Sequence, residues 1–195
     1  MLVATFAIIG ALAPTLVAVV RNAESAAATA AMTIMATQIN TMIITDLGGT
    51  GGYTYFSANG ANNGTRVNLL VSDGDIPREC SAVAAACTAW QAVVNGTTND
   101  FLERHLVTNN PGGSAANDYP DDEIVPDKYW KGAYLTAPIN PDPWGNRYMV
   151  NVQYIGASTN DVVVLSAGPD EEIDTAFTAN PVTAGDDDLI SLVES

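Results

Sequence analysis

The apolar pattern at the start of the chain predicts one long helix. Residues 1–20 carry no charged side chain, and twenty helical residues rise about 30 Å, the thickness of a bilayer's hydrocarbon core. After Arg21 the apolar positions alternate at spacings of four and three: Ala28, Met32, Met35, Ile39 and Met42. We expect a helix from residue 1 to about residue 46, roughly 70 Å long, ended by Leu47-Gly48-Gly49. A kink is expected near Pro14, which lacks a backbone donor.

Shorter patterns in the rest of the chain predict three strands. One is expected over residues 67–72, after a loop rich in Gly, Asn and Thr. Two more are expected over residues 147–154 and 161–166, and the sequence GASTN between them is typical of a hairpin turn.

A second helix is predicted over residues 76–94. Asp75 suits the N-cap, Pro77 suits the first turn, and Gly96 follows the last apolar residues. Residues 108–127 are expected to form a loop. The predicted fold class is therefore α+β: a long N-terminal helix joined to a small globular head that holds a short antiparallel sheet and a second helix.

The chain divides into an apolar beginning and an acidic remainder. Residues 1–25 form the apolar half of the helix, expected to serve as a transmembrane segment or as the core of an assembly, and residues 26–195 form the amphipathic half and the head. A signal peptide would show basic residues before the apolar run, whereas Met1 leads straight into it. A membrane anchor and a chain whose leader has been removed both remain as explanations.

The net charge is −15, from 22 acidic and 7 basic residues. Such a charge argues against nucleic acid and against anionic lipid headgroups as partners, since both would be repelled. It suits a surface that faces water or one that recruits cations.

The candidate reactive residues do not assemble into an enzyme site. Cys80 and Cys87 would lie about 10.5 Å apart on an unbroken helix, beyond the roughly 7 Å limit for a disulfide. Either the helix breaks and they pair, as we expect for an extracellular head, or both are buried thiols. His105 is the single histidine and is expected at the surface, so no Ser/His/Asp or Cys/His set is visible. Asn63 and Asn95 match the glycosylation pattern, which arises readily by chance in such a chain.

The run Asp142-Pro143-Trp144-Gly145-Asn146 is the most specific local pattern. Asp-Pro and Gly-Asn are turn chemistry, and Trp144 supplies a large apolar side chain. We interpret the run as a structural corner that turns the chain into the sheet and fastens this turn to the long helix.

The order of these motifs resembles the major pseudopilin of bacterial type II secretion and its relatives in the type IV filament superfamily. The matching stretches are Trp130 to Leu135, Pro138, Asp142 to Asn146, Tyr148, Leu165 to Asp170, and Asp187-Asp188. The resemblance covers the helix generically and residues 130–190 specifically. It implies a type IV pilin-like fold.

The resemblance also implies a calcium site in the loop after the last strands. The main-chain carbonyl of Ala167 and the carboxylates of Asp170, Asp187 and Asp188 fall on liganding positions, and hard oxygen donors suit calcium. The stretch 172–185 is longer than the family's loop, which leaves open which of Asp186, Asp187 and Asp188 fall on the liganding positions. A merely solvated acidic loop is the alternative.

By resemblance, the chain is a structural subunit of an extracellular type IV pilus-like filament, not an enzyme. Phe6, Ile9 and Pro14 would lie in the filament core of this homo-oligomer. The subunit would be inserted in the inner membrane before assembly machinery delivers it to the cell surface. The alternatives are a secretion pseudopilin and a membrane-anchored calcium-binding domain that does not polymerise. Thr5 stands where the family usually has Glu, and Glu24 lies too far along to replace it.

Overall fold

A computed structural model describes residues 2–47, 67–78, 90, 99–113, 118–119, 129–136, 138–156, 159–178 and 180–194, without the side chains of residues 2–13 and 44. The long helix α1 spans Leu2–Asn40 and continues as one π-helical segment over Thr41–Asp46, where the helix ends at the cap residue Leu47. The predicted range is confirmed. The helix is continuous across Pro14, and the kink there stays a prediction.

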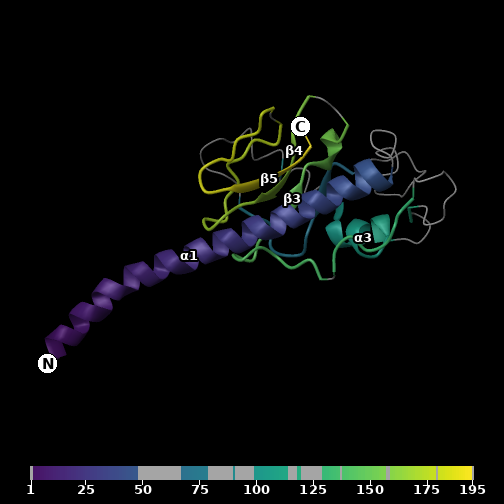
Figure 1. The fold of residues 1–195 in the computed structure, drawn as a ribbon. Coiled ribbons are helices and arrows are strands. Elements are labelled where there is room, and N and C mark those ends of the chain that lie inside the picture. The colour runs from purple at the N-terminus through teal and green to yellow at the C-terminus, as the bar shows by residue number, and fades with distance from the viewer. Residues whose placement is uncertain are drawn as a thin grey trace.

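Only the second half of α1 packs on the head (Figure 1). Every residue from 14 to 23 is exposed, and Ala28 is the first buried position among the helix residues whose side chains the structure describes. From there the predicted apolar stripe is buried against the head. The exposed fractions of Met32, Ile39 and Met42 are all 0%. The first half of the helix therefore extends beyond the head, and its described side chains, those of residues 14–20, are exposed. Within the part of the chain that the structure describes, no helix has the length and apolarity needed to cross a membrane.

A ladder of hydroxyls follows the second half of α1. Thr29, Thr33, Thr37 and Thr41 each donate a hydrogen bond to the carbonyl four residues earlier, at 2.8 to 2.9 Å. The first of these carbonyls belongs to Ser25. The hydrogen bonds of all four hydroxyls therefore lie within the helix itself.

The head is built on a five-stranded sheet with the order β2-β1-β3-β4-β5. The strands are β1 (Leu69–Val71), β2 (Asn99–Phe101), β3 (Met149–Val150), β4 (Val162–Ser166) and β5 (Leu189–Glu194). All neighbours are antiparallel except β1 and β2. The three predicted strands are confirmed as β1, β3 and β4, although β3 is short and passes into a 3-10 turn at Val152–Tyr154.

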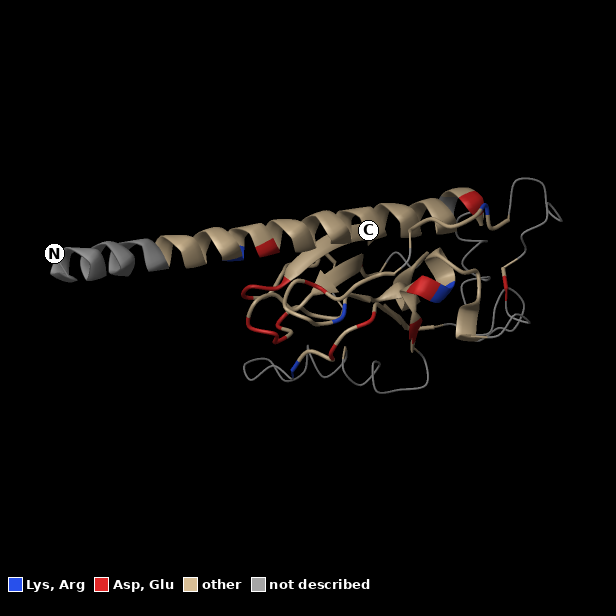
Figure 2. Cartoon of the chain, turned by 90° about the horizontal axis from the view of Figure 1, so that it is seen from below, with Lys and Arg blue, Asp and Glu red and all other residues tan. Residues whose placement is uncertain are grey.

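The sheet has a buried core on each face. Alternate residues of a strand point to opposite faces, so Val162 and Val164 join the cluster under α1, while Val163 and Leu165 join a second cluster with Trp90 and Phe177. Figure 2 shows many of the acidic residues of the head in its loops, on the side away from α1.

The predicted second helix begins in the wrong place. Asp75 and Arg78 form isolated bridges with Asn146 and Glu172 instead of a helical turn. Trp90 is helical, and the rest of the predicted range, 79–89 and 91–94, lies outside the described residues. The short helix α3, at Leu102–Leu106, was not predicted.

Candidate metal centre

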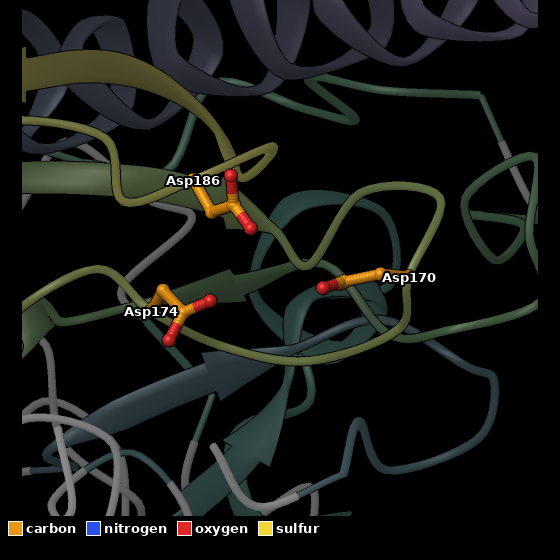
Figure 3. A group of neighbouring side chains, drawn as sticks. All are labelled: Asp170, Asp174 and Asp186. Atoms are coloured by element: carbon orange, nitrogen blue, oxygen red, sulfur yellow. The ribbon is translucent and has the colours of Figure 1, made fainter. Parts of the chain in front are cut away.

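Three carboxylates converge in the loop between β4 and β5. Oxygens of Asp170, Asp174 and Asp186 all lie within 4.8 Å of one another. Figure 3 shows the three side chains directed from separate parts of the loop toward one space. Carboxylates this close repel one another, so the arrangement favours a cation among them.

Two more carboxylates of the loop have buried oxygen atoms without a partner. Oδ1 of Asp187 and Oδ1 of Asp188 make no hydrogen bond with any described residue. The other oxygen of Asp188 accepts the backbone N–H groups of Asp174 at 2.8 Å and Thr175 at 2.6 Å. Buried carboxylate oxygens normally find donors or a cation, so these orphaned atoms fit a metal ligand set.

Burial and neighbouring charge raise the pKa of both carboxyl groups. Burial raises the pKa of Asp187 to about 6, and the nearby charge of Asp170 adds to the shift. Burial likewise raises the pKa of Asp188 to about 6, against hydrogen bonds from Thr175 and Asp174 that lower it. The loop thus holds its negative charges at an energetic cost, which a bound cation would relieve.

Two glycines allow the loop to fold this tightly. At Gly168, with φ +69°, a Cβ atom would collide with the carbonyl group of Asp187, and at Gly185 it would collide with the backbone of Asp174. Close backbone approach of this kind needs glycine.

The predicted ligand set and the observed cluster overlap at Asp170. Ala167 is fully buried at the base of the loop, and Asp187 and Asp188 supply the orphaned oxygens. Asp174 was not predicted, because it lies in the extended stretch 172–185 that has no counterpart in the resemblance, and Asp186 is one of the three residues whose register that stretch left open. In the sequence, the only feature that pointed to Asp174 as a ligand was the high density of acidic residues in this region.

The corner run is tied to this loop by Asp142. Oδ1 of Asp142 accepts the N–H groups of Trp144 at 3.0 Å and Asn146 at 2.8 Å. Oδ2 accepts the hydroxyl of Ser166 at 2.6 Å, and the Ser166 oxygen accepts the N–H of Gly168 at 3.4 Å. Trp144 packs against the core cluster that includes α1. The corner interpretation therefore agrees with the contacts, which also connect it to the base of the acidic loop.

The surface placement predicted for His105 is wrong. Its exposed fraction is 0%, with Nδ1 at 2.8 Å from the Tyr119 hydroxyl and Nε2 at 2.9 Å from Oδ2 of Asp100. Burial raises the pKa of Asp100, but the hydrogen bond and charge of His105, with the N–H groups of Gly112 and Phe101, lower it to about 2. His105 lies on the buried side of α3 with Leu102 and Leu106, a spacing of three and four that could have revealed it.

Several predicted residues lie outside those the structure describes. These are Cys80 and Cys87 with their expected disulfide, the glycosylation candidates Asn63 and Asn95, and the side chains of Thr5, Phe6 and Ile9. Pro14 is described and exposed.

A long N-terminal helix, half of it packed on a small head with a short, largely antiparallel sheet, defines a pilin-like α+β fold. Over residues 105–184 the chain matches the model of the family described as type II secretion system (T2SS), protein G. The match confirms the resemblance to the major pseudopilin, a structural subunit. No curated protein and no solved structure matches the chain.

Proposed function

We propose that the protein is a pseudopilin that polymerises through α1 into the pilus-like filament of a type II secretion system. The family match over residues 105–184 carries this proposal and favours the secretion filament over a surface pilus. The exposed apolar side chains of Leu16, Val17, Val19 and Val20 support it, because a helix that projects from its head needs a covering surface.

The proposed setting follows from the same family. The subunit would wait in the inner membrane, join a homo-oligomeric filament with the help of the secretion machinery, and present its head to the periplasm. The competing function is a tethered head that never polymerises.

Electron microscopy of filaments from cells that carry the secretion machinery tests polymerisation. Phe6→Asp or Ile9→Asp would place a charge in a dry core at a cost of several kcal/mol per subunit, so filaments should vanish while the head still folds. Ile76→Asp is the control, because Ile76 is a head residue with an exposed fraction of 43%. Normal filaments from the Phe6 and Ile9 variants would contradict the proposed core, and dispersed wild-type monomers would contradict polymerisation itself.

We also propose that the acidic loop binds calcium. The converging carboxylates of Asp170, Asp174 and Asp186, with the orphaned oxygens of Asp187 and Asp188, support this proposal. Calcium takes six to eight oxygen ligands and tolerates irregular geometry, which suits a loop donor set. The bound ion would neutralise the loop and hold it against β4 and β5.

Calcium binding is tested by thermal unfolding of the full chain in detergent. The melting temperature in millimolar calcium is compared with that in chelator. A ligand that binds only the folded state stabilises it by about 2.7 kcal/mol at a hundredfold excess over Kd, so the melting temperature should be several degrees higher in calcium. Asp170→Asn should remove the difference, whereas Asp73→Asn, an exposed carboxylate outside the loop, should keep it. Magnesium should rescue poorly, because it demands near-octahedral geometry. Equal wild-type melting temperatures in calcium and in chelator would contradict the calcium site and leave a solvated acidic loop as the alternative.

A further inference from the structure

An apolar groove lies between α1 and the segment that precedes the corner. Its volume is about 250 Å³, and its walls are Ala31, Ile34 and Met35 of α1, residues 135–136 and 138–141, and Tyr148. None of these residues carries a charge, in a chain with 29 charged residues, the sum of 7 basic and 22 acidic ones. Ile34 forms one rim, and its exposed fraction is 54%.

The groove continues an exposed stripe along one face of α1. Leu16 and Ile34 are 18 residues apart, which is five helical turns, so both side chains lie on the same face. The positions between them at helical spacing are all exposed as well: Val20, Ala23, Ala27 and Ala30. The stripe contains no charge, and it leads from the uncovered part of the helix directly to the groove.

The uncovered part of α1 cannot reach the groove of its own chain. The helix is continuous from Leu2 to Asn40, so Leu16 is held about 27 Å along the axis from Ile34. Figure 1 shows the first half of α1 pointing away from the head. An apolar side chain in the groove has to come from another molecule.

We propose that the groove beside Ile34 receives residues 14–20 of α1 from a second copy of the chain. This inference rests on the polymerisation proposed above and adds which face of the head meets the neighbouring helix. Groove and helix match in chemistry, since both are uncharged and mainly apolar, and each subunit carries one of each. A contact between two different surfaces, repeated by a rotation that does not close, builds an open helical filament.

Two substitutions, at residues with the same exposed fraction, test whether the contact lies at the groove. Ile34→Asp and Leu192→Asp each replace an apolar residue whose exposed fraction is 54%, but only Ile34 lines the groove. Both variants should melt close to the wild type in detergent. Ile34→Asp should reduce filaments at least tenfold, and Leu192→Asp should leave their number unchanged. Normal filaments from Ile34→Asp would overturn the proposal, as would equal losses from both variants.

Photo-crosslinking identifies the occupant directly. A benzophenone amino acid in place of Ile34, in the full chain in cells, should form a cross-linked dimer in which the second peptide is the tryptic fragment ending at Arg21. Cross-links to lipid, to another protein or to the head of a second copy would overturn the proposal. If the wild type forms no filaments, polymerisation itself fails; if it forms filaments without this cross-link, only the groove assignment fails.

Discussion

The carboxylate of Asp142 joins two motifs that lie 24 residues apart in the chain. One oxygen organises the corner, and the other holds Ser166, the last residue of β4 and the start of the acidic loop. Such a buried carboxylate with three donors explains why the corner has Asp before Pro-Trp-Gly-Asn, since a shorter or neutral side chain cannot bind all three donors equally well.

Removal of the Asp142 carboxylate should destabilise the head. The side chain is buried, with an exposed fraction of 4%, so Asp142→Ala leaves the buried N–H of Asn146, the buried hydroxyl of Ser166 and the half-buried N–H of Trp144 without their acceptor. We expect a loss on the order of 3 kcal/mol in the free energy of unfolding, measured with urea. Asp142→Asn keeps one acceptor oxygen and should lose about 1 kcal/mol. Equal stability of the Ala variant and the wild type would show that water replaces the carboxylate.

The burial of His105 was not predicted from the sequence. A single histidine in a polar chain is usually a surface residue, and the partners that bury it, Asp100 and Tyr119, lie five and fourteen residues away. Hydrogen bonds between side chains leave no periodic pattern. The spacing of Leu102, His105 and Leu106 was the available clue, but a helix of five residues is too short for periodicity to stand out.

Among the elements, length decided which could be predicted. The 39 residues of α1 repeat the apolar spacing many times, and β4 is a run of apolar residues, so both were predicted. β2 has three residues and pairs in parallel with β1 over a separation of thirty positions, and β5 follows directly on acidic residues that suggested a loop. Short strands are fixed by pairing between distant segments, which a local pattern does not contain.

The acidic loop should make stability depend on pH in chelator. The pKa values of Asp187 and Asp188 are about 6 in the folded chain and near 3.8 when unfolded, so the folded state binds protons more readily between these values. Stability should therefore rise as pH falls from 7 through 6, with the gain complete near pH 4. Bound calcium should reduce this increase in stability at lower pH, because the ion competes with protons for the same carboxylates.

Melting temperatures at fixed ionic strength check the pH dependence. The Asp187→Asn/Asp188→Asn double variant should lose most of the rise in chelator, because it cannot take up the two protons. A wild-type melting temperature that stays constant or falls between pH 7 and pH 5 would contradict the raised pKa values.

For the whole molecule, charge and assembly oppose each other. Each chain carries −15, and all of its acidic residues except Glu24 come after residue 45, so the proposed filament would place many negative heads side by side. In that filament, apolar contacts along α1 would have to exceed this repulsion, which salt screens.

The fraction of subunits in filaments should therefore depend on ionic strength. Lowering it from about 0.15 M to about 0.01 M lengthens the Debye length from about 8 Å to about 30 Å, so sheared filaments should disassemble or shorten. Sedimentation of purified filaments measures the polymerised fraction, and millimolar calcium should restore it at low salt. A fraction that does not change with salt would mean that the heads lie too far apart to repel.

The threonine ladder of α1 makes the helix tolerant of its surroundings. A free hydroxyl prefers water and resists transfer to an apolar medium, whereas those of Thr29, Thr33, Thr37 and Thr41 already donate to carbonyls of their own helix. When such a face moves from solvent to the side of another helix, the same hydrogen bonds persist. The threonine hydroxyls thus need no exchange of partners, and this face of α1 enters or leaves a packed environment with their hydrogen bonds unchanged.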